Sequence, residues 1–224
     1  MNRSTSLIKT TLVAIGLLAC SHSFAFDFTH LVMKTAGHAI YKEGKQASEN
    51  LTSKPSTTVA ATGSIEVAFS PNEGAEALVV KVIDSARTEI RMMSYSFTSP
   101  TVLKALLSAR HRGVDVKLVA DWESNASKTK DGNYKSPKSI AAMSALVNAG
   151  ADVLTIDKYA IAHDKVIVVD GTTVETGSYN YSASAANRNS ENVLVNWNNP
   201  ALAKVYLEHF QRNYRQGVSF KPAY

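Results

Sequence analysis

The sequence predicts an α/β fold, built on a mixed, mainly parallel β-sheet with helices on both faces. From residue 64 onward, β-branched apolar runs alternate with segments of helical periodicity, which is typical of a sheet covered on both sides. One run, VIVV at 166–169, is apolar at every position, as expected for a strand buried on both faces. The composition, 45% hydrophobic and 19% charged, is ordinary for a soluble globular chain of 224 residues.

Residues 1–25 are expected to be an export signal. Two basic residues precede the apolar run Leu12–Cys20, which is too short to span a bilayer, and the triplet Ser-Phe-Ala follows at 23–25. Its removal lowers the formal charge from +5 to +3, because the segment contains two basic residues and no acidic one. We therefore expect a bacterial periplasmic or secreted protein. The alternative is a lipoprotein anchored through Cys20, the only cysteine of the chain.

Residues 26–63 are predicted to be an N-terminal helical arm followed by a linker. Apolar residues recur at helical spacing over 28–40, which predicts one amphipathic helix. The stretch 51–64 is rich in Ser and Thr and contains Pro55, which favours a linker. We expect the arm to serve in packing, with partner binding as the alternative. The main domain is then 64–224.

The elements of the main domain follow from local signals. Pro71, after a capping Ser, predicts the start of the first helix, and Gly113 predicts the end of the second. Strands are expected at 65–69, 89–97, 114–121, 151–156 and 191–197, and helices at 70–86, 99–113, 137–150 and 200–217.

The segment 163–181, HDKVIVVDGTTVETGSYNY, is predicted to form a β-hairpin, because Asp170-Gly171 is a strong two-residue turn signal. With that loop, His163 lies opposite Ser178; with a loop one residue later, it lies opposite Asn180. Either register places four polar side chains on one face: His163, Lys165, Ser178 and Asn180. Asp170 is expected on the other face or in the turn.

These four side chains suit a tetrahedral phosphate. They supply one titratable ring, one cation and two neutral hydrogen-bonding groups, so phosphate oxygens can be bound while the ring attacks phosphorus or moves protons. The alternative is a structural His163 with its hydrogen bonds satisfied and a Lys165 that reaches solvent at a sheet edge.

The spacing His163-x-Lys165-x4-Asp170, followed by Gly177-Ser178-x-Asn180 and Glu191, resembles the HKD signature of the phospholipase D superfamily. It is most similar to the small single-motif bacterial endonucleases of that family, over about residues 64–217. The resemblance implies catalysis by His163, Lys165, Asp170 and Glu191. Lys165 and Asn180 would bind phosphate oxygens with help from Ser178, and Glu191 would accept from the ring of His163. Asp170 completes the motif, with a structural task at the turn.

A homodimer is expected because one imidazole cannot stand on both sides of phosphorus during in-line displacement. Four further histidines remain after residue 25, and none has Lys two residues later: His30, His38, His111 and His209. The second ring should therefore be His163 of another copy, with both subunits contributing to one site. No metal-ligand spacing occurs in the sequence, so we expect neither a metal ion nor a cofactor.

The expected substrate is nucleic acid, DNA or alternatively RNA, cut without sequence specificity. The loop 121–136 combines lysines with aromatic residues, which suits phosphates and unstacked bases, although such a loop is also compatible with plain solvation: Trp122, Lys128, Lys130, Tyr134 and Lys135. Two alternatives remain at this point. One is a phospholipid hydrolase or transferase using the same site, and the other is a non-catalytic nucleic-acid-binding protein of the envelope.

Overall fold

The computed structural model describes residues 34–35, 38 and 56–223. Lys34, Thr35 and His38, which fall within the predicted N-terminal helix, are helical and exposed. The expected export signal, Cys20 and most of the arm lie outside the described residues. Residues from Thr57 onward belong to the same unit as the sheet, and the side-chain amide of Asn199 donates to the carbonyl of Ala60 at 3.2 Å. The end of the predicted linker is therefore attached to the main domain.

One sheet organises the main domain. Its strands are β1 (Ser64–Ser70), β2 (Glu89–Ser94), β3 (Asp115–Asp121), β4 (Asp152–Ile156), β5 (Lys165–Val169), β6 (Thr173–Gly177), β7 (Glu191–Trp197) and β8 (Val218–Ser219). Their spatial order is β1-β7-β6-β5-β2-β3-β4-β8. The sheet is mixed, as predicted, but only β2-β3 and β3-β4 pair in parallel. The expectation of a mainly parallel sheet is wrong because the five other strand pairings are antiparallel. Strands β5 and β6, for example, are joined by a three-residue loop, which is too short for a parallel crossover.

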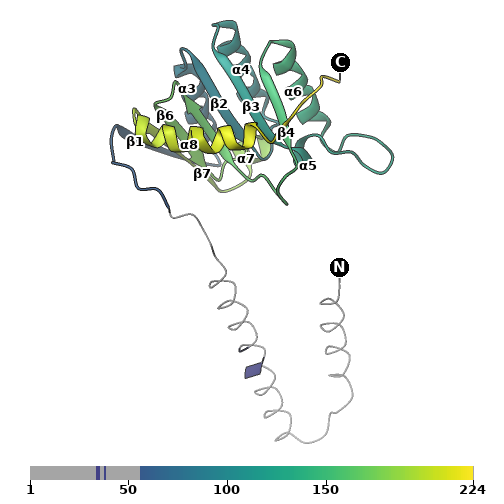
Figure 1. Cartoon of the computed structure of the whole chain (residues 1–224), viewed down its shortest axis with the longest axis horizontal. Helices are drawn as coiled ribbons and strands as arrows, with labels where there is room; N and C mark the ends of the chain where they lie inside the picture. The colour runs from purple at the N-terminus through teal and green to yellow at the C-terminus, as the bar shows by residue number, and fades with distance from the viewer. Residues whose placement is uncertain (1–33, 36–37, 39–55, 224) are drawn as a thin grey trace, which may run out of the picture. The chain divides into compact units, whose positions relative to one another are not determined.

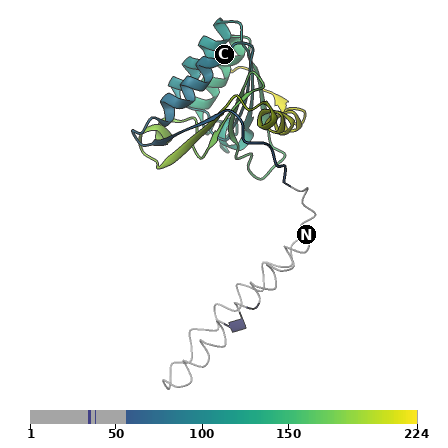
Figure 2. The same cartoon turned by 90° about the vertical axis from the view of Figure 1, so that its left-hand side faces the viewer.

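Helices cover both faces of the sheet, as predicted. They are α3 (Ala75–Ser85), α4 (Pro100–His111), α5 (Trp122–Asn125), α6 (Pro137–Asn148), α7 (Ala183–Asn187) and α8 (Pro200–Tyr214). Helices α3, α4 and α6 lie side by side behind the sheet in Figure 1, and α8 crosses its front. Figure 2 shows the resulting three layers edge-on. Within the described part of the chain, no helix has the length and apolar character needed to cross a membrane.

Local signals explain where two of the helices begin. Ser99, the first residue of the predicted helix 99–113, caps α4: its hydroxyl accepts from the backbone amide of Val102 at 3.2 Å, and Pro100 occupies the first turn. Helix α3 begins later than predicted, at Ala75. Gly74 precedes it with φ of 87°, a left-handed conformation that glycine adopts without steric cost.

Strand β5 lies at the centre of the sheet and is buried on both faces, as the VIVV run predicts. Ile167 and Val169 belong to the large core under α3, α4 and α6. Val166 and Val168 belong to the second core, which includes Phe210 of α8. Each of these four side chains is at most 3% exposed. Burial on both faces fixes which way each β5 residue points, because a slip of one residue would exchange the two sets.

The hairpin register differs from both predicted alternatives. Val169 pairs with Thr173 and Val166 with Thr176, so the loop contains three residues, 170–172. Asp170 and Gly171 have positive φ values of 51° and 63°, as their turn signal predicts, but Thr172 is an additional residue. Its carbonyl accepts from the backbone amide of Asn199 at 2.7 Å, a contact distant in sequence that local turn chemistry does not indicate.

Asp170 secures the turn to the loop that precedes β2. Its carboxylate accepts from the backbone amides of Arg87, Thr88 and Glu89, each at 2.9 Å, and from the Thr88 hydroxyl at 2.8 Å. Desolvation alone would raise the pKa of the Asp170 carboxyl, but these hydrogen bonds outweigh it and lower the pKa below its ordinary value. Asp170 therefore performs the structural task expected at the turn.

We predict that Asp170→Ala lowers the free energy of unfolding by about 2–3 kcal/mol at pH 7, because it leaves three backbone amides without their charged acceptor. Urea denaturation measures this loss, and Asp131→Ala in the exposed loop 126–136 is the matched control. Since the folded-state pKa is depressed, this stabilisation is present above the ordinary pKa and is lost as pH falls through the folded value. Equal stability of the Asp170 and Asp131 variants would contradict the assignment.

Candidate active site

The predicted site residues, apart from Asp170, gather at one edge of the sheet. Because β5 runs antiparallel to β2, Lys165 at its start pairs with Ser94 at the end of β2. The end of β6 and the start of β7 reach the same edge, where Gly177 pairs with Val193. This is also the edge where the parallel strands end, the usual place for ligands in open α/β sheets. Asp170 lies at the opposite end of β5, away from the other site residues.

Lys165 is a buried cation whose direct partners are neutral. Its residue is 5% exposed. The ammonium donates to the carbonyl of His163 at 2.9 Å and lies 5.0 Å from the ring centre of Tyr95. Burial lowers the pKa of Lys165, although the nearby carboxylates of Asp164 and Glu191 oppose the shift. A bound anion would restore the counter-charge that this ammonium lacks.

His163 projects into solvent beside this ammonium. Its ring packs against the ring of Tyr95, with centroids 4.5 Å apart and planes inclined at 57°. The backbone supports the arrangement, since the amide of Tyr95 donates to the carbonyl of Asp164 at 2.8 Å. Within residues 56–223, the His163 ring has no hydrogen-bond partner in the protein. The imidazole is thus held in place by stacking while its nitrogens stay available.

Ser178 and Glu191 form a pair across β6 and β7. The Ser178 hydroxyl donates to one Glu191 carboxylate oxygen at 2.6 Å and accepts from the backbone amide of Asn192 at 3.1 Å. The other Glu191 oxygen accepts from the side-chain amide of Asn189 at 2.9 Å. Glu191 therefore bonds Ser178 and Asn189, and the expected bond to the His163 ring is absent from these contacts. The hydroxyl proton of Ser178 is likewise directed to Glu191 and not toward a phosphate.

Gly177 makes the Ser178–Glu191 contact possible. A Cβ at position 177 would lie 2.1 Å from the carbonyl oxygen of Asn192, so the position admits no side chain. The backbones of β6 and β7 approach closely there, and the Ser178 amide donates to the same Asn192 carbonyl at 3.1 Å. Strand β6 ends at Gly177, so the turn that follows sets the directions of Ser178 and Asn180. The predicted reason for their common position, the alternation of side chains along a strand, is therefore wrong for Ser178 and Asn180.

Asn180 contributes an amide whose oxygen the protein does not use. This oxygen is buried and has no hydrogen-bond partner among the described residues. A buried amide oxygen left unpaired costs stability, so such a group marks a position where a ligand or water is expected to complete the bonding.

Two side chains near the site were not indicated by the sequence. Tyr95 follows β2 directly, and its place at the end of a strand was the only available signal. No role at the site was expected for His209, yet its Nε2 lies 3.2 Å and 3.3 Å from the carboxylate oxygens of Asp164. Because Asp164 stands between His163 and Lys165, this contact joins α8 to the start of β5.

A buried carboxyl lies two residues before Gly177. Glu175 is completely buried, and one of its oxygens accepts from the Tyr181 hydroxyl at 2.8 Å. The other oxygen has no partner in the described part of the chain. Burial raises the pKa of Glu175 to about 8, and the Tyr181 hydrogen bond only partly opposes this. Glu175 is therefore a neutral acid at pH 7 within the strand that leads to the site.

Comparisons with known proteins point to one family. The family model described as "Cardiolipin synthase, PLD-like domain" matches residues 79–214. A phospholipase D of Rickettsia bellii is 34% identical over 154 residues, which cover 68% of this chain and 71% of that protein. A mitochondrial cardiolipin hydrolase of Xenopus laevis is 30% identical over 135 residues, 60% of this chain and 58% of that protein.

One solved structure agrees with the sequence comparisons. It is the phospholipase D family member Nuc of Salmonella typhimurium, with 47% sequence identity and a TM-score of 0.65. The match covers 70% of this chain and 98% of that one. It confirms the predicted mixed α/β fold with its covering helices.

We predict that Glu175→Gln stabilises the protein increasingly as pH rises. The folded-state pKa is raised, so the wild-type free energy of unfolding falls between about pH 4.5 and pH 8 by up to about 1.4 kcal/mol per pH unit. Gln carries no proton to lose. Urea denaturation at pH 5 and pH 8 measures the difference, with the exposed Glu73→Gln as control. The assignment fails if both variants follow the wild-type pH dependence.

Proposed function

The chain belongs to the phospholipase D superfamily of phosphodiesterases, and we propose that it is a metal-independent endonuclease acting as a homodimer. The observation that carries the proposal is the pairing of His163 with Lys165. An exposed imidazole with free nitrogens stands beside a buried ammonium that has no direct anionic partner. A phosphodiester supplies both what the cation lacks and an electrophile for the ring.

In the first proposed step, a nitrogen of His163 attacks phosphorus and a phosphorus–nitrogen bond forms. The bond from phosphorus to the leaving oxygen breaks, and that oxygen takes a proton from the second imidazole. The ammonium of Lys165 and the side-chain N–H of Asn180 donate to the non-bridging oxygens, on which charge increases in the transition state. In the second step, the same second imidazole takes a proton from water. The water oxygen then attacks phosphorus and releases His163.

Ser178 and Glu191 are proposed to act as a unit. The hydroxyl of Ser178 donates to Glu191, so a direct phosphate contact from Ser178 would require that bond to open. The carboxylate of Glu191 is close enough to oppose the lowering of the Lys165 pKa. Its proposed role is to favour the cationic forms of Lys165 and of the imidazole during turnover. Asp170 takes no part in these steps because it lies at the other end of β5.

The shared site requires a contact between two copies, and β1 offers a surface for it. Ile65, Val67 and Phe69 alternate along this edge strand and are 64%, 55% and 49% exposed. Phe69 pairs with Asn192, whose backbone amide binds Ser178. The exposed apolar row thus begins beside the site. A second copy seated there would bury this row in an apolar contact between two subunits.

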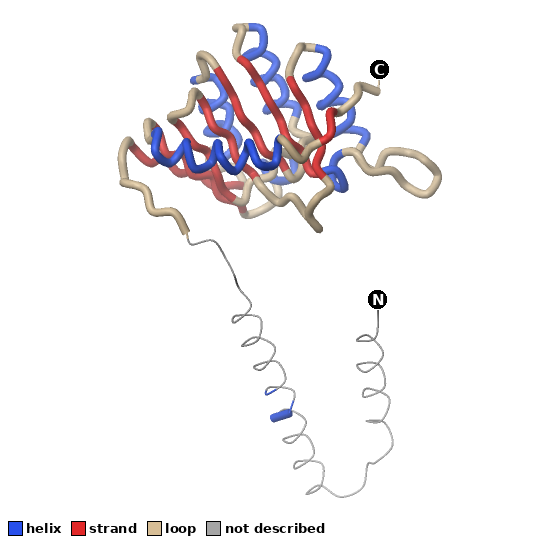
Figure 3. The backbone as a smooth tube through the Cα atoms, in the orientation of Figure 1, coloured by secondary structure: helices blue, strands red, loops and turns tan. Residues whose placement is uncertain are grey.

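Nucleic acid is the proposed substrate because the sequence resembles the endonucleases of the family and because the loop 126–136 adds cations. This loop extends away from the body of the domain (Figure 3). Its Lys128 lies 4.7 Å from the ring centre of Tyr134, and Lys130 is exposed. Such groups favour a polymer with phosphates along its length over a single headgroup.

Phospholipid is the second candidate substrate, because relatives of this chain are called phospholipase D and mitochondrial cardiolipin hydrolase. Plasmid DNA and cardiolipin vesicles, each incubated with the protein in EDTA, distinguish the two. Cleavage of cardiolipin without cleavage of DNA would replace the nuclease proposal, and binding of DNA without any cleavage would favour a non-catalytic role.

We predict that His163→Ala lowers DNA cleavage in EDTA by at least about 10³-fold, because the nucleophile is lost. His111→Ala, at the exposed end of α4, is the matched control and should retain wild-type activity. A phosphorus–nitrogen adduct should be trapped by an alkaline quench on the wild type and not on the variant. Equal cleavage by the wild type and the His163 variant would show that the activity comes from elsewhere.

We also predict that co-refolding equal amounts of wild type and His163→Ala leaves about one quarter of the wild-type activity. Only dimers with two intact imidazoles are active, and after random pairing about one quarter of all dimers are of this kind. Independent monomers would leave one half. His111→Ala in place of the His163 variant controls for losses during refolding.

A further inference from the structure

A second recess lies at the same sheet edge, next to the start of the segment that carries His163. It is formed where β3 and β4 end, by residues of α5 and of the connection from β4 to β5. The lining residues that matter here are Asp121, Trp122, Glu123, Asp157 and Tyr159. None of them takes part in the steps proposed above.

Hydrogen bonds connect the recess to the site on one side. The backbone amide of Ala162, the residue before His163, donates to a carboxylate oxygen of Asp121 at 2.9 Å. The other Asp121 oxygen accepts from the amide of Ser124 at 2.7 Å. The 4% exposed Asp121 therefore fixes both the wall of the recess and the approach to His163.

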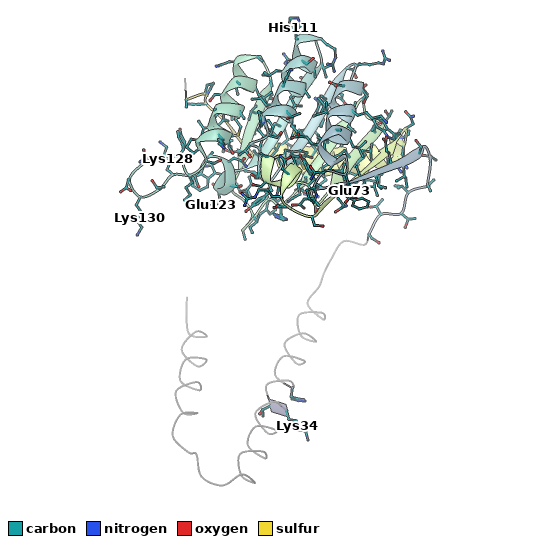
Figure 4. The ribbon with its side chains drawn as sticks, turned by 180° about the vertical axis from the view of Figure 1, so that it is seen from behind. Lys34, Glu73, His111, Glu123, Lys128 and Lys130 are labelled. Atoms are coloured by element: carbon teal, nitrogen blue, oxygen red, sulfur yellow. The ribbon has the colours of Figure 1, made fainter. Side chains whose placement is uncertain are left out.

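On its other side the recess adjoins the basic loop 126–136. Glu123 forms an ion pair with Lys135 at the end of that loop. Figure 4 shows Glu123 at the base of the loop, with Lys128 and Lys130 farther out. The recess thus stands between the proposed phosphate site and a group of cations.

Two aromatic side chains of the recess are exposed to solvent. Trp122 and Tyr159 are each 42% exposed. The hydroxyl of Tyr159 donates to the side-chain oxygen of Asn213 in α8 at 2.8 Å, which holds the ring in position. Fixed, solvent-facing aromatic rings are suited to stacking with a planar group.

The carboxylates of the recess do not form a trap for a cation. Asp121 already accepts two backbone hydrogen bonds, Glu123 is paired with Lys135, and Asp157 lies 4.0 Å from the ammonium of Lys158. Each carboxylate thus already has a hydrogen-bond or ion-pair partner within the protein. What remains is an aromatic recess with hydrogen-bond acceptors on its rim, which suits a neutral ring bearing amino groups better than a quaternary ammonium headgroup.

We propose that this recess is a nucleobase subsite, in which a base next to the cleaved phosphate stacks on Trp122 and Tyr159. The inference rests on the proposed nuclease function and specifies its substrate. A base enters only when it is unstacked, so single-stranded or locally opened nucleic acid is preferred. Acceptors on the rim favour bases with an exocyclic amino group, such as cytosine, over thymine.

The test combines removal of the ring with removal of the base. Wild type and Trp122→Ala are assayed on a single-stranded oligo(dC) and on an abasic sugar-phosphate oligomer of the same length. Wild type should cleave oligo(dC) about 10-fold better in kcat/KM than the abasic oligomer, and the variant should show almost no difference. Trp122→Phe should recover most of the preference, and wild type should prefer oligo(dC) to oligo(dT).

The control is Ile161→Ala, an exposed apolar residue of the same segment that does not line the recess. It should keep the wild-type preference. An undiminished preference in Trp122→Ala would overturn the subsite while leaving the nuclease proposal intact. If wild type cleaves neither oligomer, the nuclease proposal fails. The affinities of wild type and Trp122→Ala for each of the two oligomers are then compared by equilibrium binding. In this binding measurement, additive effects of removing the ring and removing the base would also overturn the subsite. Quenching of Trp122 fluorescence by choline and not by deoxycytidine would do the same.

Discussion

The site depends on one electrostatic condition, the burial of the Lys165 ammonium without a carboxylate in contact. Its partners are a backbone carbonyl and the face of Tyr95, which stabilise a cation without neutralising it. Such a charge is costly unless an anion joins it. The two apolar cores on either side of β5 hold the lysine in place and so maintain this cost. In the proposed mechanism, this cost is what gives the fold its affinity for a phosphate before substrate binds.

The spacing of the motif reflects the length of β5. Lys165 begins this strand at the reactive edge, and Asp170 follows its last residue, where it binds the loop before β2. The interval between the two is therefore a five-residue strand and not a set of groups meeting at one ligand. Asp170 positions the strand that carries Lys165, and the proposed catalytic residues lie at the other end of that strand.

Much of the fold could be predicted because its signals are local. The bounds of β7 (Glu191–Trp197) and the start of α4 directly after Ser99 agree with the sequence patterns. The hairpin register could not be predicted, since Thr172 is accommodated by a contact with Asn199. Likewise, the partner of Glu191 depends on the close approach that Gly177 allows between β6 and β7, which no periodicity records. His163 and Lys165 were found because their residue types are unusual at the start of an apolar strand.

The two ends of β5 have different roles, and this difference also matters for engineering. The hydrogen bonds of Asp170 lie at the end of the strand remote from His163, so rigidity and reactivity are set at separate places. Variants that are more heat-tolerant usually lose turnover when they stiffen the reactive groups themselves. Here the turn around Gly171 is a place where thermal stability can be selected with little loss of turnover. It is therefore a natural first target for directed evolution of this chain.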